Sequence, residues 1–133
     1  LTRPEWDTVR RYLLGLLSLR LRDTAGLQQA RDEIGVARAD DRLARPLRGA
    51  LDAQLRFRRG DLAGALMALQ ASDVGLPAAI RRRVPSLAQF SERQLHADVL
   101  TALGRQEEAS RWVTSLRHEP GVWGLPFLAP GFD

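Results

Sequence analysis

The sequence of 133 residues contains no cysteine, no lysine and no asparagine, and isoleucine and tyrosine are scarce. Without cysteine, the chain can form neither disulfides nor thiolate metal sites. The scarcity of β-branched and aromatic residues disfavours a sheet, whereas the abundant leucine, alanine, arginine, glutamine and glutamate favour helices. Lysine, asparagine and isoleucine have AT-rich codons, so their absence or rarity indicates a GC-rich genome, and we expect a bacterial source.

Basic charge is present but not concentrated. All 20 basic residues are arginines, and the formal net charge is +4. Residues 1–60 contain 13 arginines against 8 acidic residues, whereas residues 61–133 contain 7 against 8. This asymmetry is weaker than the dense basic stripe of a typical nucleic-acid binder. The length fits one domain, which we assign to residues 1–133.

Long apolar runs are missing as well. The strongest run, residues 12–19, ends at Arg20 and falls well short of the roughly 20 residues that a bilayer requires. Glu5 and Asp7 precede this run, which is untypical of a signal peptide. The sequence starts at Leu1 without a methionine. We expect a fragment of a longer protein, located in the cytoplasm or at the periphery of a membrane-bound complex.

The motifs of common catalytic and metal sites are also absent. His96 and His118 are the only histidines, and the sequence has no HExxH motif and no His pair at i and i+4. Glu107 and Glu108 diverge by about 100° on a helix, so they suit the helix dipole better than a shared catalytic role. There is no glycine-rich phosphate loop and no nucleophile elbow. We expect no enzymatic activity, no metal, no cofactor and surface positions for both histidines.

A turn pattern that occurs three times is the main positive feature. Residues 22–27, 60–65 and 103–109 each follow one amphipathic segment and begin another. Asp23 and Asp61 are 38 residues apart, and Gly60 and Gly104 are 44 residues apart, whereas strict repeats of this kind keep about 34. The pattern predicts helical hairpins at residues 4–35, 46–71 and 86–117. The irregular linkers also permit a compact orthogonal bundle.

Individual residues predict where these helices begin and which of their faces are apolar. Asp23 and Asp61 are predicted N-caps, and Pro46 is expected at the start of a helix. Trp6, Val9, Leu13, Leu16 and Leu17 recur at helical spacing in the first helix, and Leu14, Leu19 and Leu21 widen its apolar face. We therefore expect neighbours to cover this helix on two sides. Trp112 lies on the apolar stripe of the last helix and is predicted to be a core residue.

With these features, the chain resembles the tetratricopeptide-repeat family. The match is strongest at residues 97–116, where the matching positions are Ala97, Leu103-Gly104, Glu107-Glu108-Ala109, Trp112 and Leu116. The resemblance implies an all-α fold of antiparallel helical hairpins, stacked as a short and irregular α-solenoid. It also implies a binding platform in which the first helix of each pair lines a concave groove. The groove-lining candidates, carried over by alignment to the three turns, are Tyr12, Leu16, Arg20, Gln54, Phe57, Arg58, Gln94, Asp98 and Thr101.

The last residues form a segment of different composition. Residues 118–133 are rich in proline, glycine and aromatic residues, and they predict an extended cap on the last hairpin. Trp123 and Phe127 either pack over the helix of Trp112 or dock onto a partner chain. Both alternatives remain open at the level of sequence.

The leading functional prediction is a protein–protein interaction module. It would act as a scaffold, an accessory subunit or a regulatory repeat segment of a larger protein or assembly. The prediction rests on the repeated turn pattern and on the lack of a recognisable catalytic constellation. The alternative is a binder of an anionic surface, either nucleic acid or membrane headgroups, through Arg81, Arg82 and Arg83. A solvated helix face is the simpler explanation of that arginine run.

Overall fold

The computed structural model describes residues 2–35, 41–72 and 90–117, and the regular structure in these ranges is entirely helical. The prediction of an all-α fold is therefore confirmed for this part of the chain. The predicted hairpins agree with the observed helices to within a few residues. The helices are α1 (Arg3–Arg20), α2 (Thr24–Glu33), α3 (Ala44–Arg58), α4 (Leu62–Ser72), α6 (Phe90–Ala102) and α7 (Gln106–Arg117).

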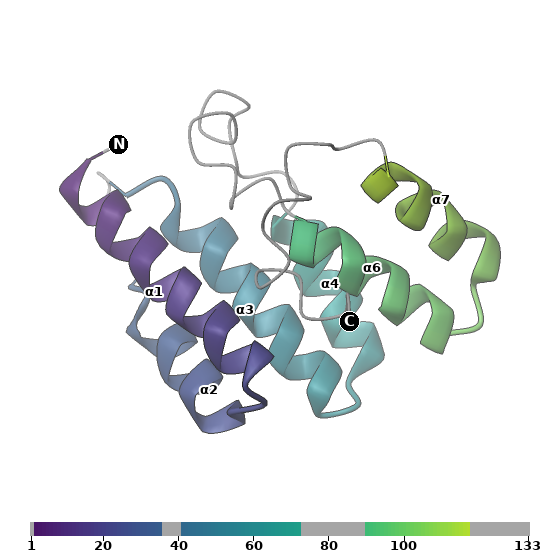
Figure 1. The fold of residues 1–133 in the computed structure, drawn as a ribbon, viewed down its shortest axis with the longest axis horizontal. Helices are drawn as coiled ribbons and strands as arrows, with labels where there is room; N and C mark the ends of the chain where they lie inside the picture. The colour runs from purple at the N-terminus through teal and green to yellow at the C-terminus, as the bar shows by residue number, and fades with distance from the viewer. Residues whose placement is uncertain (1, 36–40, 73–89, 118–133) are drawn as a thin grey trace.

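The described helices pack in chain order as three hairpins. The pairs are α1 with α2, α3 with α4, and α6 with α7. Successive pairs are also in contact, because α3 packs against α1 and α2, and α6 packs against α3 and α4. In Figure 1, α1 lies at one end of the molecule and α7 at the other, with α3 and α6 between them. Each hairpin therefore receives much of its packing from its neighbours in the sequence.

The same backbone turn closes all three hairpins. The residue in the left-handed conformation is Arg22 in the first turn (φ 60°), Gly60 in the second (φ 81°) and Gly104 in the third (φ 80°). The next residue then donates its N–H to the carbonyl five positions earlier, at 2.8 Å from Asp23 to Ser18, 2.9 Å from Asp61 to Arg56 and 2.8 Å from Arg105 to Leu100. This bond defines a Schellman turn. The recurring turn pattern in the sequence is therefore a recurring turn in the structure.

Side-chain caps start the second helix of two hairpins. The Asp23 carboxylate accepts the Gly26 N–H at 2.9 Å, and the Asp61 carboxylate accepts the Gly64 N–H at 2.9 Å. Both predicted N-caps are thereby confirmed. The expected start at Pro46 was wrong by two residues, since α3 begins at Ala44. The cause is Asp41, whose Oδ1 accepts the backbone N–H groups of Leu43 and Ala44, each at 3.1 Å.

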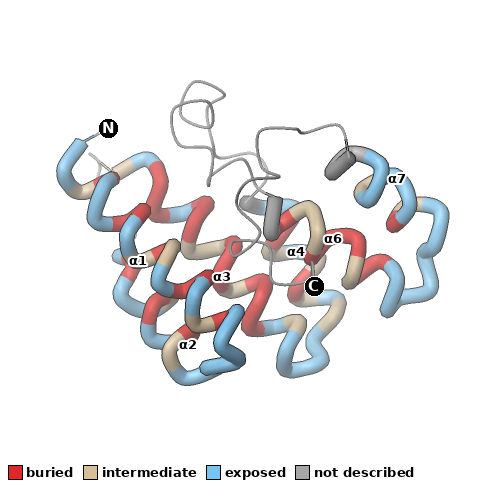
Figure 2. Tube along the Cα trace, in the orientation of Figure 1, coloured by how far each residue is buried: buried red, intermediate tan, exposed pale blue. Residues whose placement is uncertain are grey.

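The core consists of two clusters of buried aliphatic side chains that meet at α3. One cluster joins α1, α2 and α3, and the other joins α3, α4 and α6. Figure 2 shows buried positions along most of α3, whereas the described part of α7 is mostly exposed. The largest fully buried aliphatic side chains are Leu16, Leu27, Ile34, Leu43, Leu47, Leu51, Leu55, Leu69 and Leu100.

Helix α1 is covered on one side, which corrects the expectation of two. Its buried stripe consists of Val9, Tyr12, Leu16 and Leu19, at the helical spacing i, i+3, i+7 and i+10. The second apolar stripe stays in solvent, because its side chains are between 47% and 69% exposed. Its members are Trp6, Leu14, Leu17 and Leu21, which we call the outer stripe of α1.

The three turns provide a test of the backbone assignment. We expect Gly60→Ala and Gly104→Ala each to lower the free energy of unfolding by about 1 kcal/mol, because an L-residue is strained at positive φ. Arg22 already carries this strain, so Arg22→Gly should not lower the free energy of unfolding. Gly35→Ala is the control, since Gly35 has no positive φ and a methyl group there would meet nothing within 4 Å. Urea denaturation of the four variants measures these values, and equal losses in all four would contradict the assignment.

Candidate functional site

The predicted groove residues divide into buried and accessible positions. Tyr12 and Leu16 are each 1% exposed, and Gln54 is also buried. In this structure they are core residues rather than the lining of an open groove. Phe57, Gln94 and Asp98 are half-buried, whereas Arg20, Arg58 and Thr101 are exposed.

Several of the accessible candidates bond within the chain. Arg58 Nη2 donates to the Leu19 carbonyl at 2.9 Å, and Gln94 Nε2 donates to Asp98 Oδ1 at 3.1 Å. Burial raises the pKa of the Asp98 carboxyl, and the hydrogen bond from Gln94 offsets part of that effect. These contacts hold helices together and position side chains, and they assemble no reactive group.

Tyr12 is buried, and its hydroxyl makes a long-range hydrogen bond. Its hydroxyl donates to the Oε1 atom of Glu92, which lies on α6 and is itself buried. Burial, reinforced by the nearby Glu92 carboxyl, raises the pKa of the Tyr12 phenol well above its ordinary value. The phenol therefore remains a hydrogen-bond donor throughout the neutral range.

His96 is the clearest departure from the sequence prediction for a single residue. It was expected at the surface but is 5% exposed. Its ring stacks on the indole of Trp112, with ring centroids 4.0 Å apart and an angle of 13° between the planes. Trp112 itself is half-buried, so this pair joins α6 to α7 at the margin of the core.

Other predicted site residues lie outside the described residues. They are Trp123 and Phe127 of the expected cap, and Arg81, Arg82 and Arg83 of the expected anionic-surface site. Within residues 2–35, 41–72 and 90–117, no three histidine, aspartate or glutamate side chains form a group that could hold a metal ion. No helix in these ranges combines the length and apolar character needed to cross a membrane.

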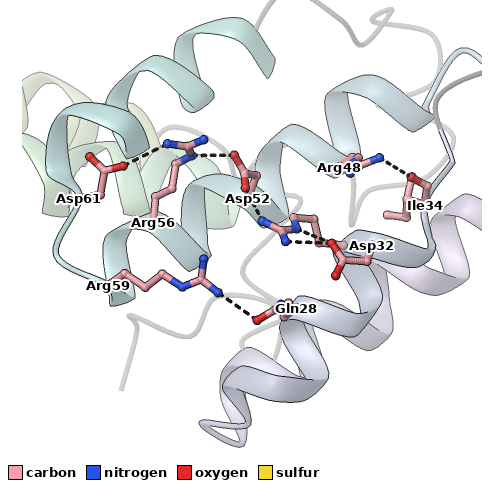
Figure 3. A network of polar contacts seen from close by, with 9 residues as sticks. Gln28, Asp32, Ile34, Arg48, Asp52, Arg56, Arg59 and Asp61 are labelled. Atoms are coloured by element: carbon pink, nitrogen blue, oxygen red, sulfur yellow. Dashed lines mark hydrogen bonds and ion pairs between the residues drawn. The ribbon is translucent and has the colours of Figure 1, made fainter.

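A polar network that sequence analysis did not identify links α2, α3 and the start of α4 (Figure 3). Asp52 on α3 is its centre, because Oδ1 accepts from Arg31 at 2.8 Å and Oδ2 accepts from Arg56 at 2.8 Å. Arg31 also pairs with Asp32 at 2.8 Å, and Arg56 also pairs with Asp61 at 3.0 Å. Charges of opposite sign therefore alternate along one line across the hairpins.

The electrostatics of this network favour an ionised Asp52. Partial burial raises the pKa of the Asp52 carboxyl, but the hydrogen bonds and charges of Arg56 and Arg31 outweigh burial. The pKa consequently lies below its ordinary value. Both carboxylate oxygens are thus committed to arginines at neutral pH.

A hollow of about 390 Å³ opens beside this network. We call it the arginine pocket, and its lining residues are Arg31, Arg45, Arg48, Gly49 and Asp52. Four of the five lie on α3 at the spacing i, i+3, i+4 and i+7, which is one face of the helix. That spacing is a signal in the sequence. The approach of Arg31 from the last turn of α2 depends on how the hairpins pack and has no local signal.

The structure therefore offers two accessible features of unusual character, the outer stripe of α1 and the arginine pocket between α2 and α3. Neither contains a nucleophile beside a base, and neither matches a catalytic arrangement. The chain matches no family model, no curated protein and no solved structure with which it was compared. Its function must therefore be argued from these two features.

Proposed function

We propose that this chain is a protein–protein interaction module that serves as a scaffold, an accessory subunit or a regulatory segment of a larger assembly. The observation that supports the proposal is the outer stripe of α1. Trp6, Leu14, Leu17 and Leu21 are large apolar residues on one helix, and each is close to half exposed or more. Scattered exposed apolar residues are normal on a protein surface, whereas several large ones gathered on one helix face are typical of an interaction site.

The spacing of these residues places them in one row along α1, which Arg10 interrupts between Trp6 and Leu14. Trp6 and Leu17 are 11 residues apart, which is close to three full turns of an α-helix. Leu14, Leu17 and Leu21 follow at i, i+3 and i+7. A partner helix that presents its own apolar face could lie along this row, as in helix-in-groove recognition. Trp6 would then be the anchor, because tryptophan is enriched among the residues that contribute most to binding energy.

The charges beside the row indicate the chemistry of the partner. The exposed arginines of α1 are Arg3, Arg10 and Arg20, of which Arg10 lies within the row, and the exposed carboxylate of this helix is that of Asp7. Asp7 lies 4.0 Å from Arg10, so this ion pair is long and exposed and contributes little. We therefore propose as the occupant an amphipathic helix of another protein, with acidic residues flanking its apolar face. Such charge complementarity would mainly set specificity and association rate.

The packing order of the helices also supports a module of stacked hairpins. The contacts of α3 with the first hairpin and of α6 with the second support the proposal of a short α-solenoid similar to tetratricopeptide repeats. In such arrays the terminal helices carry a face that another unit can cover.

A photocrosslinking residue at position 17 tests the proposal in the source cell with the full gene product. We expect Leu17 replaced in this way to crosslink to one protein, through a peptide that forms an acidic amphipathic helix. The control is the same residue at Ala63, which is exposed on α4 away from the outer stripe. Leu14→Glu should abolish the crosslink while changing stability by less than about 0.5 kcal/mol, as expected for an exposed site. Crosslinks to lipid or nucleic acid, crosslinks of equal yield from Ala63, or none at all would contradict the proposal.

The alternative of a macromolecular anionic surface rests on Arg81, Arg82 and Arg83, which the structure does not describe. In the described ranges most arginines that could serve such a surface are held in pairs with carboxylates or carbonyl groups, as Arg31, Arg56 and Arg58 are. The same crosslinking experiment separates this alternative from the protein partner.

A further inference from the structure

The arginine pocket contains more positive charge than its own carboxylate can balance. Three guanidinium groups line it, from Arg31, Arg45 and Arg48, and Asp52 supplies the one carboxylate in the lining. Both oxygens of Asp52 are already used, one by Arg31 and the other by Arg56. Asp52 therefore has no oxygen left for Arg45 or Arg48.

The positive charges of Arg45 and Arg48 are not balanced by a carboxylate elsewhere in the described part of the chain. Arg48 is half-buried, and its Nη1 atom donates a hydrogen bond of 3.3 Å to the Ile34 carbonyl. Arg45 makes no hydrogen bond and no ion pair with a described residue. Arg45 is exposed, whereas burial removes part of the hydration of Arg48, so a nearby anion would stabilise the charge of Arg48. An anion added to the pocket would thus be favourable.

The position of Arg45 at the start of α3 adds to this excess of positive charge. Arg45 lies in the first turn of the helix, where the positive end of the helix dipole disfavours a cation. The first turn of α3 carries no acidic residue. Asp41 precedes the helix, but its Oδ1 is bound to the amides of Leu43 and Ala44. The anion is therefore expected along the side of the helix, between Arg45 and Arg48.

We propose that the arginine pocket binds a phosphate monoester or free phosphate, with the guanidinium groups of Arg45 and Arg48 donating to its oxygens. A phosphate group carries a charge of about −1.5 to −2 at neutral pH, which matches two uncompensated arginines. Guanidinium groups recognise phosphate through paired N–H donors, which gives both strength and geometric selectivity. This site involves α2 and α3 and is independent of the protein-binding role proposed for α1.

Titration with inorganic phosphate and with O-phosphoserine, at constant ionic strength and pH, tests the site. We expect a saturable shift of the Gly49 amide resonance, because this residue lines the pocket. The Arg45→Gln, Arg48→Gln double variant should bind at least about tenfold more weakly, since it removes the donors that recognise the phosphate. Tighter binding of O-phosphoserine would identify an esterified ligand, and equal or weaker binding would identify free phosphate.

Two controls separate a defined site from general attraction to positive charge. Arg10→Gln, on exposed α1, should leave the affinity unchanged to within about twofold, because charges at a distance are largely screened by salt. Asp52→Asn should strengthen binding, since it removes the negative charge from the lining. Phosphate should raise the melting temperature of the wild type and not that of the double variant, whose own cooperative melting transition would show that it is folded. A shift that does not saturate, or equal weakening by Arg10→Gln, would overturn the proposal.

Discussion

Replacing Leu51 by alanine should lower the free energy of unfolding by about 2–5 kcal/mol, the cost usually found for buried leucines. Leu51 is fully buried in α3, at the place where α1 passes closest. A methyl group added to Gly15 of α1 would lie 2.8 Å from both terminal carbons of Leu51. The two backbones are therefore near each other because glycine faces leucine there. Truncating Leu51 leaves a cavity that neighbours cannot fill without moving whole helices.

A double-mutant cycle makes this prediction specific. In the Leu51→Ala background, Gly15→Ala should recover part of the about 1 kcal/mol by which alanine is the better helix former, because the added methyl group no longer meets Leu51. In the wild-type background the same change meets Leu51, and also Ala30 at 3.2 Å, so this gain should be lost. Leu17→Ala, on the outer stripe, is the control and should cost less than about 0.5 kcal/mol. Additive effects of Gly15→Ala and Leu51→Ala in urea denaturation would show that the two helices do not pack as described.

The second large effect is expected for Tyr12→Phe. The change removes a buried hydrogen bond to a carboxyl oxygen of Glu92 while keeping the size of the ring. Removing one partner of a buried hydrogen bond leaves the other unsatisfied, which costs about 1–3 kcal/mol, so we expect a loss in this range. Amide hydrogen exchange should also increase in α6, because this bond ties α6 to α1.

The pH dependence of the same variant has a definite sign. The pKa of Tyr12 is raised in the folded protein, so above about pH 10 the unfolded chain loses a proton that the folded chain keeps. Stability contributed by Tyr12 is therefore complete below about pH 10 and falls as the pH rises further. The difference between wild type and Tyr12→Phe should shrink in that range. A difference that stays constant up to pH 11 would show that the phenol is not held in its protonated form.

The helices and turns could be predicted from sequence because their causes are local. Asp23 and Asp61 cap helices through amides three residues away, and Gly60 and Gly104 provide the backbone conformation that the turns need. Each signal lies within a few residues of the structure that it specifies. The all-α fold and the approximate bounds of the hairpins follow from such signals alone.

Which face of each helix is buried was harder to predict, because burial depends on which distant segments of the chain pack against that face. Two apolar stripes of α1 have nearly the same periodicity, and sequence analysis could not tell that Tyr12 would be buried and Trp6 exposed. Tyr12 packs in the core cluster, and Glu92, 80 residues further along, accepts the hydrogen bond that its buried hydroxyl needs. His96 is buried because Trp112 covers its ring. The arginine pocket likewise requires Arg31 to meet α3 from another hairpin.

The order in which the helices pack has a consequence for how the chain folds. The main contacts join helices that are adjacent or nearly adjacent in sequence, so forming them closes short loops. Proteins with such local contacts fold in microseconds to milliseconds, because little chain entropy is lost before each contact forms. During synthesis, α1 and α2 can associate before α6 has left the ribosome. The Tyr12–Glu92 bond, by contrast, can form only late. It would then mark the completion of the described fold, long after its first hairpin is in place.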